Sequence, residues 1–249
     1  MLYRMLVCSL LLTVISGTCF AQDVRIEAEA RYWFPDLDSE VKYQGTQFDV
    51  KDDLGLRDED FPEARITWHT GPNSRLRLDY TQISYSGDQT LNRLIIFDNQ
   101  AYNVGTRVTT DFDLQYLRLG WIWQFINFFD DKVKLGTVLD LKALMIDLKL
   151  DAPAVPLSEN EDFIGGLPTI GLACEINPIK KLNIFAEFSG LTAGDYGYFF
   201  DAEAGIRFIP VKNFSISGGY RMFKIKIEDD PDLAQVEISG PFIGASLRF

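Results

Sequence analysis

Apolar and polar residues alternate with a period of two along most of the chain. In the first such segment, Ile26, Ala28 and Ala30 alternate with the charged residues Glu27 and Glu29. This period is typical of a β-strand with one face in an apolar environment and the other in a polar one. The pattern recurs in ten segments, at residues 24–34, 63–69, 75–81, 117–124, 133–143, 169–176, 183–189, 201–208, 214–222 and 243–249.

The connections between these segments alternate in length. Tight turns are expected at residues 71–74, 177–181 and 210–213, with a slightly longer turn at 127–132. Mostly longer, acidic connections are expected at roughly 35–61, 86–110, 151–163, 192–198 and 229–235. Short turns at one end and long loops at the other are typical of bacterial outer-membrane barrels. We therefore predict an all-β fold: a transmembrane, antiparallel, up-and-down β-barrel of about 10 strands, with 8 or 12 strands as alternatives. A periplasmic sandwich or lipocalin-like barrel, with the charged face outside, is the soluble alternative.

Aromatic residues are grouped near the ends of the predicted strands. One group lies beside the short turns (Trp68, Trp123, Phe208 and Phe214), and the other lies toward the long loops (Trp33, Tyr80, Phe188, Phe200 and Tyr220). Aromatic girdles at both interfaces are expected of a membrane barrel.

The first 21 residues have the features of a secretory signal peptide. Arg4 is the only charged residue, an apolar stretch runs over residues 6–15, and small residues Cys19 and Ala21 precede the expected cleavage point. The expected organisation is a signal peptide at 1–21 and an outer-membrane barrel at 22–249. Cys174 is then the only cysteine left, so no internal disulfide is expected.

Composition and charge exclude several classes of protein. The chain of 249 residues is 47% hydrophobic, which excludes a disordered chain, and its formal charge is −12. Loss of Arg4 with the signal peptide would make the charge −13. Such an acidic chain repels phosphate backbones, so we expect no nucleic-acid partner.

The polar face of the predicted strands carries many full charges of both signs. In a barrel of ten strands these side chains face a narrow lumen, where unpaired charges are costly. We predict a salt-bridge network that plugs the lumen; a narrow charged pore is the alternative. The predicted network consists of Arg25, Glu27, Glu29, Arg31, Arg65, Arg75, Arg77, Asp79, Arg118, Asp140, Glu175, Glu187, Asp201, Glu203, Arg207, Arg221 and Arg248, and the same face also carries Glu63 and Lys142.

The candidate chemistry is sparse. His69 is the only histidine, and it lies beside the turn at 71–74, at the periplasmic end. Omptin-like proteases also have ten strands, but they need a histidine and acids at the outer rim, and outer-membrane lipases pair a serine with an outer-rim histidine. We therefore expect no enzymatic activity, no catalytic residue and no cofactor; a surface lipid-modifying enzyme is the remaining catalytic alternative.

The first long connection is strongly acidic. It contains Asp49, Asp52, Asp53, Asp58, Glu59 and Asp60. Clustered carboxylates can bind divalent cations, although this spacing does not match an EF-hand loop. We expect a solvated surface loop, with divalent cations as candidate partners and no defined metal site.

Two features resemble known families. The segment from Ile243 to Phe249 resembles the last strand of outer-membrane barrels, whose terminal aromatic residue, here Phe249, is the assembly signal read by the barrel assembly machinery. Residues 45–56, followed by 63–66 and 74–80, resemble the first loop and hairpin of a family of small proteobacterial outer-membrane barrels without assigned activity. The resemblance implies an outer-membrane location, with lipids and lipopolysaccharide as neighbours, and a structural or surface-interaction role. A narrow channel for small solutes or ions is the alternative role.

Overall fold

The computed structural model describes residues 25–43, 46–57, 59–97, 100–130, 132–152 and 157–249. The predicted signal peptide at 1–21 therefore lies outside the described residues. None of the helices formed by the described residues is long and apolar enough to cross a membrane.

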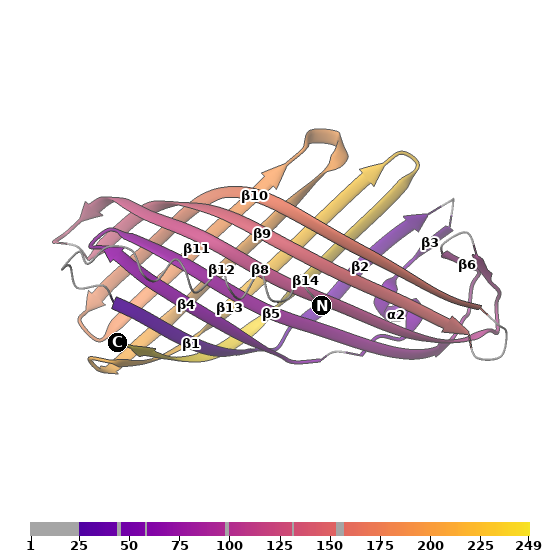
Figure 1. Ribbon diagram of the computed structural model, residues 1–249, viewed down its shortest axis with the longest axis horizontal. Helices are drawn as coiled ribbons and strands as arrows, with labels where there is room; N and C mark the ends of the chain where they lie inside the picture. Colours follow the sequence, from indigo (N-terminus) through magenta and orange to yellow (C-terminus); the bar gives the residue numbers. More distant parts are fainter. Residues whose placement is uncertain (1–24, 44–45, 58, 98–99, 131, 153–156) are drawn as a thin grey trace, which may run out of the picture.

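The described residues form an almost entirely β structure (Figure 1). Its elements are β1 (Arg25–Trp33), β2 (Asp36–Tyr43), β3 (Thr46–Phe48), α2 (Val50–Leu54), β4 (Phe61–Gly71), β5 (Ser74–Thr90), β6 (Ile95–Phe97), β7 (Gln100–Tyr102), β8 (Arg107–Phe128), β9 (Val133–Ala152), β10 (Leu157–Ile179), β11 (Leu182–Thr192), the 3₁₀ helix η2 (Gly194–Tyr196), β12 (Gly197–Val211), β13 (Phe214–Asp229) and β14 (Asp232–Arg248).

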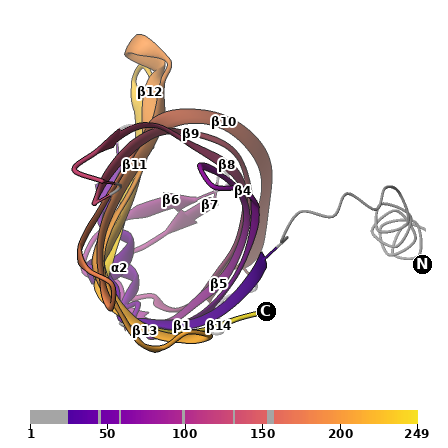
Figure 2. The ribbon, with the colours of Figure 1, turned by 90° about the vertical axis from the view of Figure 1, so that its left-hand side faces the viewer.

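The sheet closes into an antiparallel barrel of ten strands. The hydrogen-bonded order is β1-β4-β5-β8-β9-β10-β11-β12-β13-β14, and β14 pairs with β1 to complete the ring. Strand β2 continues the course of β1 along β14 after an interruption at Phe34 and Pro35. The predicted fold and strand number are therefore confirmed, and closure leaves no exposed edge at the level of the ring (Figure 2).

The two ends of the barrel differ, as the connection lengths predict. The four tight turns and the C-terminus lie at one end, the turn end, and the longer connections lie at the other, the loop end (Figure 1). The prediction of long connections at 86–110, 151–163 and 229–235 is wrong in extent. Strands β5, β8, β9 and β10 extend far beyond the ring, β10 reaches 23 residues, and β13 and β14 meet in a tight turn.

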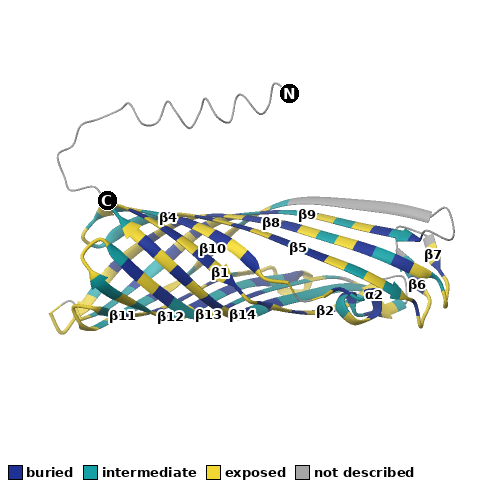
Figure 3. Ribbon diagram, turned by 90° about the horizontal axis from the view of Figure 1, so that it is seen from below, coloured by how far each residue is buried: buried dark blue, intermediate teal, exposed yellow. Residues whose placement is uncertain are grey.

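The strands extend because apolar and polar residues continue to alternate toward the loop end. There, however, the apolar residues face inward and the polar residues face outward. On β8, Leu117 and Leu119 face outward and Arg118 inward, whereas nearer the loop end Leu114 is buried inside and Asp113 is exposed outside. The same reversal occurs on β5 after Tyr80. An apolar belt thus surrounds the turn-end half of the barrel, and a polar surface surrounds the loop-end half. Exposed and buried residues alternate along the strands in both halves (Figure 3).

Two seams interrupt the wall in this loop-end half. Pairing of β4 with β5 ends at Glu63 and Thr81, so the rest of β5 has no β4 partner. Here α2 lies between β2 and β5: the Val50 N–H donates to Ser39 Oγ of β2 at 2.9 Å, and Leu56 forms a β-bridge with Gly87 of β5. This helix therefore covers the first seam.

The second seam lies between β10 and β11. Their pairing ends at Ile170 and Gly190, although β10 continues to Leu157 along β9. The β11–β12 hairpin projects away from the ring (Figure 2). The wall is therefore not hydrogen-bonded between these two strands at the loop end.

Candidate functional site

A layer of paired charges fills the barrel inside the apolar belt. Among the described residues, nine basic and nine acidic inward side chains make ion pairs with one another, so the layer has no net formal charge. The basic members are Arg31, Arg65, Arg75, Arg77, Arg118, Lys142, Arg207, Arg221 and Arg248, and the acidic ones are Glu27, Glu29, Glu63, Asp79, Asp140, Glu175, Glu187, Asp201 and Glu203.

Many of these contacts connect strands on different sides of the ring. Arg31 of β1 and Arg65 of β4 both donate to Glu203 of β12, at 2.7 and 2.9 Å. Arg77 of β5 lies 2.6 Å from Glu187 of β11. Charge-assisted and bidentate contacts of this kind fix long side chains across the lumen rather than along its wall.

The centre of the layer is inaccessible to solvent. Arg77, Arg118, Asp201 and Glu203 are 2–4% exposed, and Lys142 is fully buried. Lys142 Nζ donates to Ser189 Oγ at 2.7 Å and lies 3.3 Å from Asp201 Oδ2. A water-filled pore would expose its wall side chains, whereas these side chains are buried.

Glycine makes room for some of these side chains. A Cβ at Gly120 would lie 2.5 Å from Asp140 Oδ1, and one at Gly244 would lie 2.8 Å from Ser217 Oγ and 2.9 Å from Arg31 Cγ. The absence of a side chain at these positions lets the charged groups pack in the small cross-section of the ring.

The layer becomes more accessible toward the turn end. Here the Arg248 guanidinium donates to Glu27 at 2.5 Å, and His69 Nε2 lies 3.7 Å from the same carboxylate. A cavity of about 30 Å³, bordered by Glu27, His69 and Arg207 among others, lies beside them. It has room for one or two water molecules.

The structure thus brings together all the predicted network residues except one. Arg25 is exposed at the turn-end start of β1 and makes none of the ion pairs in this layer. His69 lies at the turn end, on the opposite side of the charged layer from the longer connections. Phe249 follows β14 with its side chain 74% exposed, and its N–H donates to the Ile26 carbonyl at 2.8 Å.

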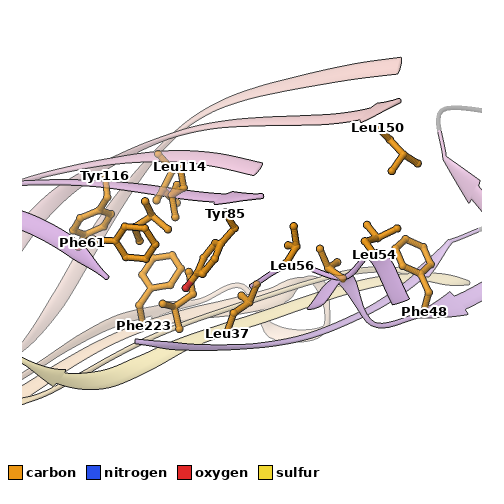
Figure 4. Close-up of a cluster of buried hydrophobic side chains, with 14 of the residues drawn as sticks. Leu37, Phe48, Leu54, Leu56, Phe61, Tyr85, Leu114, Tyr116, Leu150 and Phe223 are labelled. Atoms are coloured by element: carbon orange, nitrogen blue, oxygen red, sulfur yellow. The ribbon is translucent and has the colours of Figure 1, made fainter. Parts of the chain in front are cut away.

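The interior of the loop-end half is apolar, which the sequence interpretation did not foresee. A cluster of buried apolar side chains occupies it (Figure 4), including Tyr85, Leu114, Tyr116 and Leu150 from the extended strands and Leu54 from α2. On β8, inward apolar residues such as Leu114 precede the outward apolar residues that begin at Leu117, and this reversed alternation was the signal that could have revealed the apolar interior.

Trp33 belongs to this interior and not to an aromatic girdle, so its predicted place was wrong. Its side chain is 1% exposed, and its Nε1–H donates to the Gly240 carbonyl at 3.1 Å. The guanidinium of Arg221 lies 5.1 Å from the indole ring. Trp33 therefore joins the apolar cluster to the charged layer.

Two acids of the first long connection, Asp49 and Asp53, have structural partners. Asp49 caps α2 by accepting from the Asp52 N–H at 2.7 Å, and Asp53 forms an ion pair with Arg93 at 3.1 Å. Asp58 lies outside the described residues. Within the part of the chain that is described, no three His, Cys, Asp or Glu side chains are grouped so that they could hold a metal ion.

A further pair on this water-facing half is formed by Asp88 and Arg107. The hydrogen bond from the Arg107 guanidinium, at 2.6 Å, holds the pKa of the Asp88 carboxyl below its ordinary value. Both side chains are exposed, so the pair adds little to stability.

Comparison with known proteins shows the fold alone. No protein-family model and no curated protein sequence matches the chain. The structure is similar to that of the outer-membrane protease OmpT from Escherichia coli, with a TM-score of 0.59 and 8% identity over 94% of this chain and 99% of that one. A weaker similarity is to Ail from Yersinia pestis in complex with a heparin analogue, with a TM-score of 0.44 and 15% identity over 92% of this chain and 100% of that one. Another is to the translocator domain of the autotransporter NalP from Neisseria meningitidis, with a TM-score of 0.45 and 11% identity over 99% of this chain and 96% of that one. The chain therefore has the fold of a transmembrane outer-membrane β-barrel.

Proposed function

We propose that this chain is an integral outer-membrane β-barrel with a sealed interior, whose role is structural or one of interaction at the cell surface. The observation that carries the proposal is the layer of ion pairs inside the apolar belt. This layer has no net formal charge, is buried, and is connected across the lumen. The apolar belt and the similarity of fold to outer-membrane barrels support the location. Membrane lipids and lipopolysaccharide are then its direct neighbours.

The position of His69 supports a non-catalytic role. OmpT is named as a protease, and an activity exposed at the cell surface would need its reactive groups at the loop end. Here the only histidine lies at the turn end, beside Glu27 of the ion-pair layer. Its imidazole lies beside that layer and not where it could meet a substrate at the loops.

Solute flux through vesicles tests the proposal. Refolded barrels in vesicles should release trapped potassium ions and a small sugar no faster than protein-free vesicles. Replacing Arg77 and Arg118 together with serine removes contacts to Glu187 and Asp140 and leaves buried carboxylates without these partners. Because breaking a buried pair costs about 3–5 kcal/mol, this variant should leak or lose its folded form on gels.

Arg107→Ser is the matched control. Its guanidinium also pairs with a carboxylate, Asp88, but on the exposed surface outside the plug. Vesicles that carry this variant should release potassium ions and sugar no faster than vesicles that carry the wild type. Release from vesicles that carry the wild-type barrel, above the protein-free rate, would contradict the sealed interior and favour a channel.

A further inference from the structure

The second seam, between β10 and β11, leads into an apolar pocket of about 230 Å³. Its inner wall includes Leu144 and Phe199, both buried members of the interior cluster, and Leu167 and Ile225, which pack against that cluster. The volume exceeds the ~150 Å³ of an apolar protein cavity that stays dry and takes up benzene. Such a pocket favours an apolar occupant over water.

The pocket opens at the outer boundary of the lipid-facing belt. Gly166 lies opposite Ala143, next to the point on β9 where the outward residues change from Leu141 to Asp147. At the rim, Leu191 and Ile227 are exposed apolar residues. The mouth of the pocket is thus apolar and lies near the level at which the lipid-facing belt ends, within reach of a lipid acyl chain.

A lysine lies at the same rim. Lys226 of β13 lines the pocket, and Lys224 lies on the same outward face of that strand. Among the described residues, Lys226 Nζ has one carboxylate contact, to the half-exposed Glu228 at 2.5 Å, and an ammonium has three N–H donors, so it can still donate to another anion. Lys224 pairs with Glu237 at 2.9 Å, so Lys226 is the lysine at this opening that lines the pocket and can share its ammonium donors with an anionic headgroup.

The floor of the pocket separates it from the charged layer. The Phe199 ring lies 4.9 Å from Lys142 Nζ and stacks edge-on against Phe223 at 5.1 Å. An occupant would therefore end in the apolar cluster above the plug, and the plug would remain intact.

We propose that the seam between β10 and β11 is a binding site for one acyl chain of an anionic lipid from the surrounding outer leaflet, with the headgroup at Lys226. The site rests on the membrane location proposed above, but not on the absence of conduction. One seam of the barrel is thus covered by α2, and the other is covered by lipid.

Native mass spectrometry of the purified barrel tests this site. The barrel is inserted into vesicles of equal amounts of phosphatidylethanolamine and phosphatidylglycerol and then extracted in mild detergent. The mass of the barrel together with any retained lipid is then measured. The wild type should keep one phosphatidylglycerol molecule. Leu167→Gln places an amide in the pocket and should lower retention about tenfold.

The chain offers matched controls for both parts of the site. Ile146 packs, like Leu167, against the interior cluster but does not line the pocket, so Ile146→Gln should retain lipid. Lys226→Gln should keep the acyl chain but lose the preference for phosphatidylglycerol. Lys149→Gln, which breaks a similar pair with Asp151 at 2.9 Å elsewhere, should keep that preference.

Wild-type barrels without retained lipid, or equal loss in Leu167→Gln and Ile146→Gln, would overturn the proposal. An unchanged preference in Lys226→Gln would overturn the assignment of the headgroup. Heat-dependent gel migration of each variant shows whether it inserted and folded. Failure of the membrane location is therefore distinguished from failure of the lipid site.

Discussion

Gly120 shows how single residues determine the packing of the charged layer. A methyl group here would collide with the Asp140 carboxylate, which pairs with Arg118 at 2.8 Å. Gly120→Ala should therefore displace this pair and destabilise the barrel by about 1–3 kcal/mol, the usual cost of overpacking. Urea denaturation in detergent measures the effect. Gly71→Ala is the control, because a Cβ there meets no atom within 4 Å; equal destabilisation of both variants would contradict the account.

Cys174 tests the side-chain register of β10. It lies opposite Leu135 and Ala186, with the exposed residues Leu172 and Ile176 on either side along the same outward face. A thiol facing lipid should react slowly with water-soluble maleimides in folded vesicles and quickly after unfolding, and Cys174→Ala should assemble normally. Rapid labelling of the folded barrel would mean that this face of β10 meets water.

At the scale of the strand, the reversal of polarity defines where the membrane ends. Leu119 and Gln115 both face outward on β8, on either side of the reversal at Leu117. Leu119→Lys should cost about 2–4 kcal/mol, whereas Gln115→Lys should cost about 0–1 kcal/mol, because a charge is expensive only at membrane depth. Folding equilibria into lipid vesicles measure both values. Similar costs for the two variants would contradict the boundary.

Strand number, turn positions and the inward charges could be predicted from the sequence because each depends on local alternation. Residues 117–121 show this alternation, with Leu117, Leu119 and Trp121 outward and Arg118 inward. The inward apolar residues of the same strand, such as Leu114, have the opposite phase. A search for one continuous pattern of outward apolar residues therefore stops before them and predicts a loop where the strand continues. Cross-lumen partners could not be predicted, because Arg31 and Glu203 are 172 residues apart and meet only when the ring closes.

At the scale of the whole molecule, the charges are segregated. The eighteen paired side chains inside the belt cancel one another, so the excess of 36 acidic over 24 basic residues lies elsewhere in the chain. Above this neutral layer lies the apolar interior, and outside the loop-end half lie residues such as Asp111 and Asp113. In the proposed sealed interior, ions would meet two successive barriers along the axis: an apolar interior, and then a layer in which each charged side chain already has an ion-pair partner.

Single-channel recording of the purified barrel in a planar bilayer tests this central claim most directly. Insertion is established separately by heat-dependent gel migration of the same preparation. The sealed interior predicts no steady current from the wild type in symmetric potassium chloride, at voltages of either sign. A stable, ion-selective conductance of the wild-type barrel would contradict it, because such a current requires a continuous water path through side chains that are buried here.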